Sequence, residues 1–188
     1  MSELNEISGH SGELAVHVAR AHGVETMFTL SGAHVFPMYD GAVQTQKEGQ
    51  GPQVRLLDVR HEQTAAFAAE ATGKLTRVPG LAVLTAGPGV TNGISAIAQA
   101  QFAGSPMVVV GGRAPQNRWG SGSLQELDQP PILESISKLA RTLHTAADGN
   151  GRTSTPIASP PPPRTTNCSP CTRPSTGSRS GTRRRPSW

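Results

Sequence analysis

Four short runs of apolar residues, separated by segments with helical periodicity, most constrain the fold of this chain. The runs are apolar at consecutive positions, as expected for strands that are covered on both faces. Strands that alternate with helices of about 11 to 16 residues are typical of a parallel sheet with helices on both sides. The sequence therefore predicts a doubly wound α/β domain, with strands at 26–30, 54–59, 81–85 and 107–110.

Helix signals fill the segments between these strands. Ser11 is suited to cap a helix over residues 11–22, and Gly23 is suited to end it. The other predicted elements are a helix that follows Ser31-Gly32-Ala33-His34, helices over 61–75 and 90–102, a long loop over 111–131, a helix or turn, and a strand at 141–145. Loops as long as 111–131 are usually functional.

The composition changes abruptly near residue 149. Residues 149–188 contain no Asp or Glu, but seven Arg and eight Pro. Removing these seven Arg from the 17 basic residues leaves 10 against 13 acidic residues, so residues 1–148 carry a net charge of −3. We therefore expect a folded domain over 1–148 and a tail over 149–188 that is disordered or locally polyproline II. The abrupt change is typical of a reading-frame shift or another truncating event, and a genuine basic tail is the alternative.

This division also limits the classes of function. The basic charge belongs to the tail, so it gives no support for nucleic-acid binding by the domain. No apolar stretch approaches the roughly 18 residues that span a membrane, and the first residues do not resemble a signal peptide. Cys168 and Cys171 lie in the tail without the second pair of ligands that zinc requires. We expect a cytoplasmic protein with no membrane partner, no nucleic-acid partner and no metal site of its own.

Two strand-to-helix junctions carry the chemically informative residues. Glu62 follows the second predicted strand within Arg60-His61-Glu62, and the turn Gly87-Pro88-Gly89 follows the third. Because the carboxyl ends of parallel strands meet at one edge, both junctions are expected beside the same pocket. Glycine lets the backbone approach a flat ligand closely. The simpler interpretation of Glu62 is an ordinary acid in the first turn of a helix, where the dipole favours a negative charge.

The spacing Gly87-x-Gly89-x-x-Asn92 is also similar to the dinucleotide-binding fingerprint. Three features argue against a dinucleotide. The third position is Asn, Pro88 has no amide donor, and the next strand ends at Gly111-Gly112-Arg113 without an acid for the ribose. We therefore do not expect dinucleotide binding.

The pairing of this glutamate with the glycine turn resembles the pyrimidine-binding domain of thiamine-diphosphate enzymes. The resemblance covers about residues 11–147 and is strongest for acetolactate synthases and 2-hydroxyacyl-CoA lyases. It implies that Glu62 shares a proton with the pyrimidine ring nitrogen of the cofactor, which requires a partly desolvated carboxyl group. The other residues that it places at the cofactor are Thr85, Gly87, Pro88 and Asn92.

The resemblance extends to a substrate side of the site. Ser31-Gly32-Ala33-His34 is similar to a Ser-Gly-Gly-His sequence of the family, with Ala33 at one glycine position. Gln125 lies in a segment similar to the family's Phe-Gln-Glu, with Leu124 in place of the aromatic residue. The residues implied along the substrate channel are Gly32, His34, Gln125 and Lys138. For His34 and Lys138, the simpler interpretations are a polar loop residue and a solvated surface lysine.

The resemblance implies decarboxylation of a 2-oxo acid such as pyruvate, followed by carbon–carbon bond formation with a second carbonyl compound, as in branched-chain amino-acid biosynthesis. An acyl-CoA enzyme, either a 2-hydroxyacyl-CoA lyase or an oxalyl-CoA decarboxylase, is the alternative. The family's magnesium and diphosphate motif, and its further helix and strand after residue 148, are not found in this sequence. We therefore expect a homo-oligomer or a pairing with a chain that carries the diphosphate-binding half, unless the chain is a non-catalytic relic. FAD as a second cofactor is left open.

Overall fold

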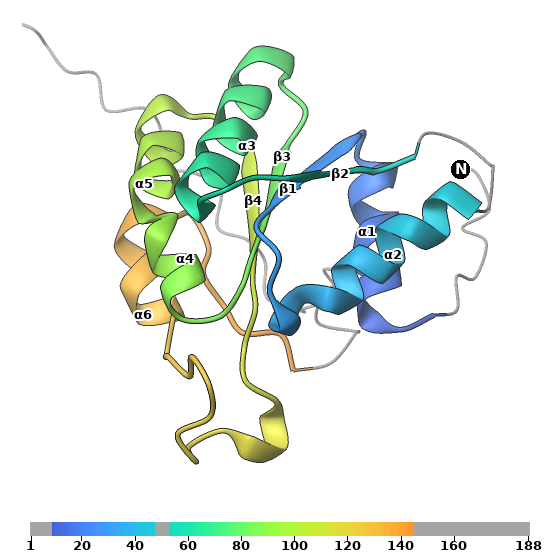
Figure 1. Cartoon of the computed structure of the whole chain (residues 1–188). Coiled ribbons are helices and arrows are strands. Elements are labelled where there is room, and N and C mark those ends of the chain that lie inside the picture. Colours follow the sequence, from blue (N-terminus) through green and yellow to red (C-terminus); the bar gives the residue numbers. More distant parts are fainter. Residues whose placement is uncertain (1–8, 48–52, 145–188) are drawn as a thin grey trace, which may run out of the picture. The chain divides into compact units, whose positions relative to one another are not determined.

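The structure is a computed structural model that describes residues 9–47 and 53–144. Its four strands form one parallel sheet in the order β2-β1-β3-β4 (Figure 1). The strands are β1 (Thr26–Thr29), β2 (Arg55–Asp58), β3 (Gly80–Leu84) and β4 (Met107–Gly111). All four predicted strands are confirmed, each to within one residue at either end. The tail predicted over 149–188 lies outside the described residues.

Helices cover both faces of this sheet. On one face lie α1 (Ser11–Ala21) and α2 (Phe36–Lys47), and on the other lie α3 (Glu62–Thr76) and α5 (Ile94–Ala103) (Figure 1). Neighbouring residues of β1 enter different cores: Met27 packs in the core that contains α1 and α2, and Phe28 packs in the core that contains α3. This is the doubly wound arrangement that the continuously apolar runs predicted. None of the described helices is long and apolar enough to cross a membrane.

The central strand β3 is the most enclosed part of the sheet. All five of its residues are buried, and it pairs with β1 on one side and β4 on the other. Its side chains alternate between the two cores, with Leu81 and Val83 in one and Ala82 and Leu84 in the other. The loop that leaves the carboxyl end of β3 therefore starts from a fixed position.

The first helix has a different cap from the predicted one. His10, and not Ser11, is the N-cap residue: its ring Nδ1 accepts hydrogen bonds from the backbone N–H groups of Gly12 and Glu13, at 3.2 and 3.3 Å. Ser11 is already the first helical residue. Gly23, with a φ of +84°, follows the end of α1 as predicted, in a conformation that favours glycine.

The single helix predicted over 90–102 is two helices. α4 (Pro88–Asn92) is a short helix, and α5 starts after Gly93. A Cβ atom on Gly93 would lie 2.9 Å from Leu84 Cδ1 and 3.3 Å from the Val90 carbonyl oxygen, so the chain runs close to the Leu84 side chain here. This contact depends on tertiary packing, which the periodicity of the sequence does not reveal.

The chain after β4 forms short helical turns. These are η2 (Gln116–Arg118), α6 (Pro130–Leu133) and η3 (Glu134–Ile136), so the helix or turn predicted after the long loop is confirmed. The strand predicted at 141–145 is wrong for its described residues, 141–144, none of which belongs to a strand. The described sheet ends at β4, and the His144 ring lies at hydrogen-bond distance from Gln116 Oε1 instead, at 3.2 Å.

Candidate functional site

The order of the strands creates a switch point between β1 and β3. The loop after β1 leads to α2 on one face of the sheet, and the loop after the neighbouring β3 leads to α4 and α5 on the other. Ligands of open α/β sheets bind in the crevice at such a point, outside the carboxyl ends of the strands. Gly32 and His34 belong to the first loop, and Thr85 and Gly87 belong to the second.

A buried hydrogen-bond chain ties the two strands together beneath this point. The Thr29 hydroxyl donates to the Val83 carbonyl oxygen at 2.6 Å. The Tyr39 hydroxyl lies 2.7 Å from the Thr29 hydroxyl oxygen and also donates to the Leu30 carbonyl oxygen at 3.3 Å. Burial raises the pKa of the Tyr39 hydroxyl. The ends of β1 and β3 are thereby held in register under the site.

Glu62 is a buried acid in the first turn of α3. Its exposed fraction is 9%, and its Oε2 accepts a hydrogen bond of 2.9 Å from Asn92 Nδ2, at the end of α4. The capping of α3 is done by His61, whose Nδ1 accepts from the Gln63 N–H group at 3.1 Å. The carboxylate of Glu62 is therefore not used to cap its own helix and is directed towards α4.

The glycine turn lies against this acid. Gly87, which has a φ of +58°, is the N-cap residue of α4, and Pro88 is the first residue of that helix. A Cβ atom on Gly89 would lie 2.6 Å from Thr85 Cγ2 and 3.7 Å from Glu62 Oε1. The turn thus brings Thr85 and Glu62 onto one small surface, and only glycine leaves that surface open.

The loop after β1 joins the loop after β3 through His34. Its ring Nδ1 and the Thr85 hydroxyl are 3.2 Å apart, within hydrogen-bond distance. A Cβ atom on Gly32 would collide with the Thr85 side chain, and a Cβ atom on Gly112 would collide with His34 Cβ. His34 is therefore fixed at the switch point, in contact with the same threonine that borders the glycine turn.

The predicted channel residue Gln125 also reaches this surface, but Lys138 does not. Gln125 has a left-handed φ of +58°, and its carbonyl oxygen lies 2.7 Å from where a Cβ of Gly87 would be. Its loop is closed by Glu126, which accepts hydrogen bonds from the N–H groups of Gly120 and Ser123. Lys138 is exposed, and no hydrogen bond or ion pair in the described part of the chain joins it to the other site residues.

Comparison with known proteins identifies the domain. Residues 10–132, more than half of the chain, match the family described as "Thiamine pyrophosphate enzyme, N-terminal TPP binding domain". The chain belongs to this family. The resemblance predicted from the glutamate and the glycine turn is therefore confirmed, as is the fold class that it implies.

Two groups of relatives match the TPP binding domain. The chain is 55% identical over 137 residues to the acetolactate synthase large subunit of Mycobacterium tuberculosis, an overlap of 73% of this chain and 24% of the relative. It is 40% identical over 139 residues to the 2-hydroxyacyl-CoA lyase 2 of Danio rerio and of Homo sapiens, overlaps of 74% of this chain and 21% of each relative. The chain thus spans about a quarter of the length of these relatives.

The residues of this TPP binding domain fit the pyrimidine part of the cofactor. The second carboxylate oxygen of Glu62, Oε1, accepts no hydrogen bond from the described residues, and it is not fully enclosed, because every fully buried side-chain N or O atom of these residues has a partner. It lies 3.7 Å from where a Cβ atom of Gly89 would be, so the glycine turn runs close to the acid. One carboxylate, one hydroxyl and one amide are suited to bind the edge of a ring that carries both donors and acceptors.

Three contributors to the site were not predicted. Gly112 makes room for His34, His61 caps α3 in place of Glu62, and Glu126 closes the loop that carries Gln125. The pair Gly111-Gly112 after a strand was a usable signal, because a glycine at a strand end often marks a close approach of the backbone. The roles of His61 and Glu126 depend on backbone N–H groups, so no comparable sequence signal could have identified them.

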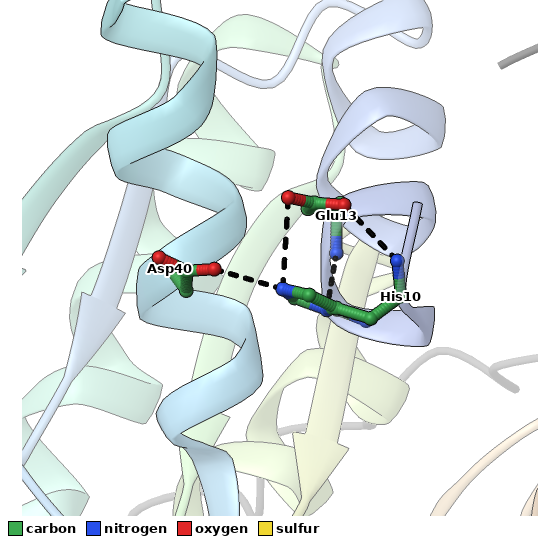
Figure 2. Close-up of polar contacts among 4 residues, drawn as sticks. His10, Glu13 and Asp40 are labelled. Carbon is green, nitrogen blue, oxygen red and sulfur yellow. Dashed lines mark hydrogen bonds and ion pairs between the residues drawn. The ribbon is translucent and has the colours of Figure 1, made fainter. Parts of the chain in front are cut away.

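A second polar cluster, formed by His10, Glu13 and Asp40, has the side-chain types of a metal site (Figure 2). His10 Nδ1 accepts from two backbone N–H groups, so the ring proton is on Nε2, which lies 2.9 Å from Asp40 Oδ2 and donates to it. A metal ion would need the Nε2 lone pair. Since Nδ1 is already an acceptor, that would require a doubly deprotonated ring. The cluster is therefore a helix cap that also ties α1 to α2.

Proposed function

We propose that this domain forms the pyrimidine side of the thiamine-diphosphate site in an acetolactate synthase-type enzyme. The observation that carries the proposal is the buried Glu62 carboxylate, which faces the Gly87–Gly89 turn with one oxygen held by Asn92 and the other without a partner among the described residues. Membership in the TPP binding family and 55% identity to an acetolactate synthase support it.

In this proposal, Glu62 holds a proton between its Oε1 and the nitrogen at the edge of the pyrimidine ring. Bound thiamine diphosphate would supply a carbon that can form a carbanion and act as a nucleophile. The hydrogen bond from Asn92 fixes the orientation of the carboxylate, and bonds to charged groups contribute about 1.5–3 kcal/mol.

The remaining site residues have positioning roles in the proposal. Thr85, Gly87 and Pro88 form the wall against which the ring lies, and their arrangement is rigid because it follows the buried strand β3. Gly32, His34 and Gln125 lie on the substrate side, where the His34 ring is oriented by its contact with Thr85. Lys138 would reach a substrate carboxylate only with help from a partner or a loop movement.

The proposed reaction is the decarboxylation of a 2-oxo acid and its joining to a second carbonyl compound. A 2-hydroxyacyl-CoA lyase is the second candidate, favoured by 40% identity to such enzymes and by the Ser31–His34 loop. The magnesium and diphosphate contacts would come from residues outside this domain, in a partner subunit or a second chain. A cytoplasmic location belongs to the proposal and is supported by the lack of cysteine in residues 1–148. FAD binding is not required by any residue described.

Reconstitution tests this proposal. The purified full chain is mixed with a polypeptide that comprises the remaining length of the Mycobacterium tuberculosis relative, together with thiamine diphosphate and Mg²⁺. We expect acetolactate from pyruvate only when both chains are present. The chain alone should give none, because the few hydrogen bonds available for the pyrimidine contribute about 1 kcal/mol each, less than the cost of ordering the ligand.

Other outcomes of the reconstitution distinguish the alternatives. Cleavage of a 2-hydroxyacyl-CoA without acetolactate formation would favour the lyase. A mixture of two folded chains that binds no thiamine diphosphate by calorimetry would refute the cofactor proposal and favour a non-catalytic relic.

A further inference from the structure

The outer edge of β4 carries backbone groups that no described segment uses. Pro106 and Gly112, at the two ends of β4, both hydrogen-bond to the neighbouring strand segment through Gly80 and Leu84. Because backbone groups alternate in direction along a strand, Val108 and Val110 also face β3, and Met107, Val109 and Gly111 face outward. No hydrogen bond joins these outward groups to another part of the chain within the described residues.

The two edges of the sheet differ in their protection. The other edge strand, β2, has exposed charged residues at both ends, Arg55 and Asp58. Charged side chains on an edge strand discourage pairing with another chain. β4 has the sequence Met-Val-Val-Val-Gly, without any charge, and its second residue, Val108, is 49% exposed. The β4 edge therefore lacks the protection that the β2 edge has.

We propose that β4 pairs with β4 of a second copy of this chain, antiparallel and about a two-fold axis at Val109. In this register Val109 exchanges two hydrogen bonds with its own equivalent, and Met107 of each copy pairs with Gly111 of the other. All three outward residues then find partners. Val108 of one copy lies opposite Val110 of the other, which covers its half-exposed side chain.

Two observations favour a second copy over other occupants. The register is self-complementary, because the outward residues are spaced symmetrically about Val109. The sequence outside the described residues after β4 has little to pair with it, since residues 145–188 contain, of Val, Ile, Leu and Phe, only Ile157. Pairing of two β4 edges leaves only the charged β2 edges exposed, so association should stop at the dimer.

Sedimentation equilibrium of the full chain tests the proposal, across a wide range of protein concentration. The wild-type chain should exist as monomer and dimer in a concentration-dependent equilibrium. Val108→Lys should raise the dimer dissociation constant about tenfold or more, because it puts a charge opposite Val110 at two symmetric places in the interface. Leu75→Lys is the matched control: it adds the same charge at an 84% exposed residue of α3 and should leave the dimer unchanged.

Amide exchange supplies a second readout that does not depend on a variant. The N–H groups of Met107, Val109 and Gly111 should exchange more slowly as the protein concentration rises, and those of β2 should not. A wild-type chain that is monomeric throughout, or that associates without limit, would overturn the proposal. So would a dimer that Val108→Lys and Leu75→Lys weaken equally. The result is independent of cofactor binding, so it neither supports nor weakens the proposed function.

Discussion

The first turns of α1 and α3 are built from the same residue types and serve different purposes. Each helix is capped by a histidine whose Nδ1 accepts backbone N–H groups, and each has a glutamate in the first turn. At α1, Glu13 returns to the N–H group of His10 at 3.0 Å and closes a capping box. At α3, Glu62 turns away from the cap and binds Asn92 instead. An acid becomes available to a site when another residue takes over the capping of its helix.

The surroundings of the two acids follow from this difference. Glu13 lies in an exposed network with His10 and Asp40, where the ring Nε2 is 3.7 Å from its Oε1 (Figure 2). Glu62 has one amide partner, no cation bonded to it in the described chain, and an exposed fraction of 9%. A carboxylate that is buried with few partners costs stability, and such groups occur where function requires them.

The largest expected effect comes from neutralising the two acids in turn. In the reconstituted reaction, Glu62→Gln should lower the initial rate of acetolactate formation about 100-fold or more, because it removes the proton-holding group. Glu13→Gln should leave the rate unchanged, since a glutamine can still form the capping box. Equal losses in both variants would contradict the separation of roles between the two helix starts.

Stability measurements keep this result interpretable. Glu62→Gln should change the free energy of unfolding by less than about 1 kcal/mol, because the amide oxygen still accepts from Asn92 and a buried charge is removed. If the calorimetric affinity for thiamine diphosphate falls while the urea midpoint is preserved, the loss is in the site and not in the fold.

Replacing the two caps is the next test. His10→Ala should lower the free energy of unfolding by about 2 kcal/mol, at the upper end for a helix cap, because two N–H groups and the link to α2 are lost together. His61→Ala should cost about 1 kcal/mol or less, since it releases a single N–H group at an exposed position. Urea unfolding followed by circular dichroism measures both.

The exposed His22 offers a control for these variants. The His22 ring makes no hydrogen bond in the described structure. The free energy of unfolding of His22→Ala should therefore lie within about 0.5 kcal/mol of the wild-type value. If His61→Ala lowers the free energy of unfolding more than His10→Ala does, the hydrogen-bond network around α1 contributes little to stability.

The smallest expected effect is at Asp40, whose carboxylate accepts from His10 Nε2. Asp40→Asn keeps an acceptor and removes the charge of a side chain that is 53% exposed, so the cost should be below about 0.5 kcal/mol. The difference in free energy of unfolding between Asp40→Asn and the wild type should become smaller at high salt, where exposed charges are screened. Unfolding midpoints at two salt concentrations measure it, and a difference that persists at high salt would indicate a role beyond electrostatics.

The sequence predicted the sheet and its two helical layers because those depend on local patterns. Apolar runs identified β1 to β4, and the strand ends placed Glu62 and the Gly87–Gly89 turn at one edge. Chain order alone could not reveal the close approach of Gly93 to Leu84, at the point where the predicted helix is divided in two. The predicted strand at 141–145 failed because apolar periodicity says nothing about whether a neighbouring strand is available.

Capping was the least predictable feature. Ser11 is a common capping residue and His10 is not, so propensity favoured the wrong residue. The structure prefers His10 because its ring reaches both the helix N–H groups and Asp40 on the next helix, and only the packing of α1 against α2 brings that acid near. The resemblance placed Lys138 along the substrate channel, and in the described structure this residue is exposed and not hydrogen-bonded to the other site residues.

The glycines of the site limit which side chains can occupy their positions. At Gly32, Gly87, Gly89 and Gly112 even a methyl group would meet a neighbouring atom, so these positions admit one residue type. Gly120 and Gly122 have open space around them, but their positive φ angles restrict them in another way. Leu124, adjacent to Gln125 and 76% exposed, has neither restriction. A different side chain at position 124 would therefore lie largely in solvent and would meet no unfavourable φ angle.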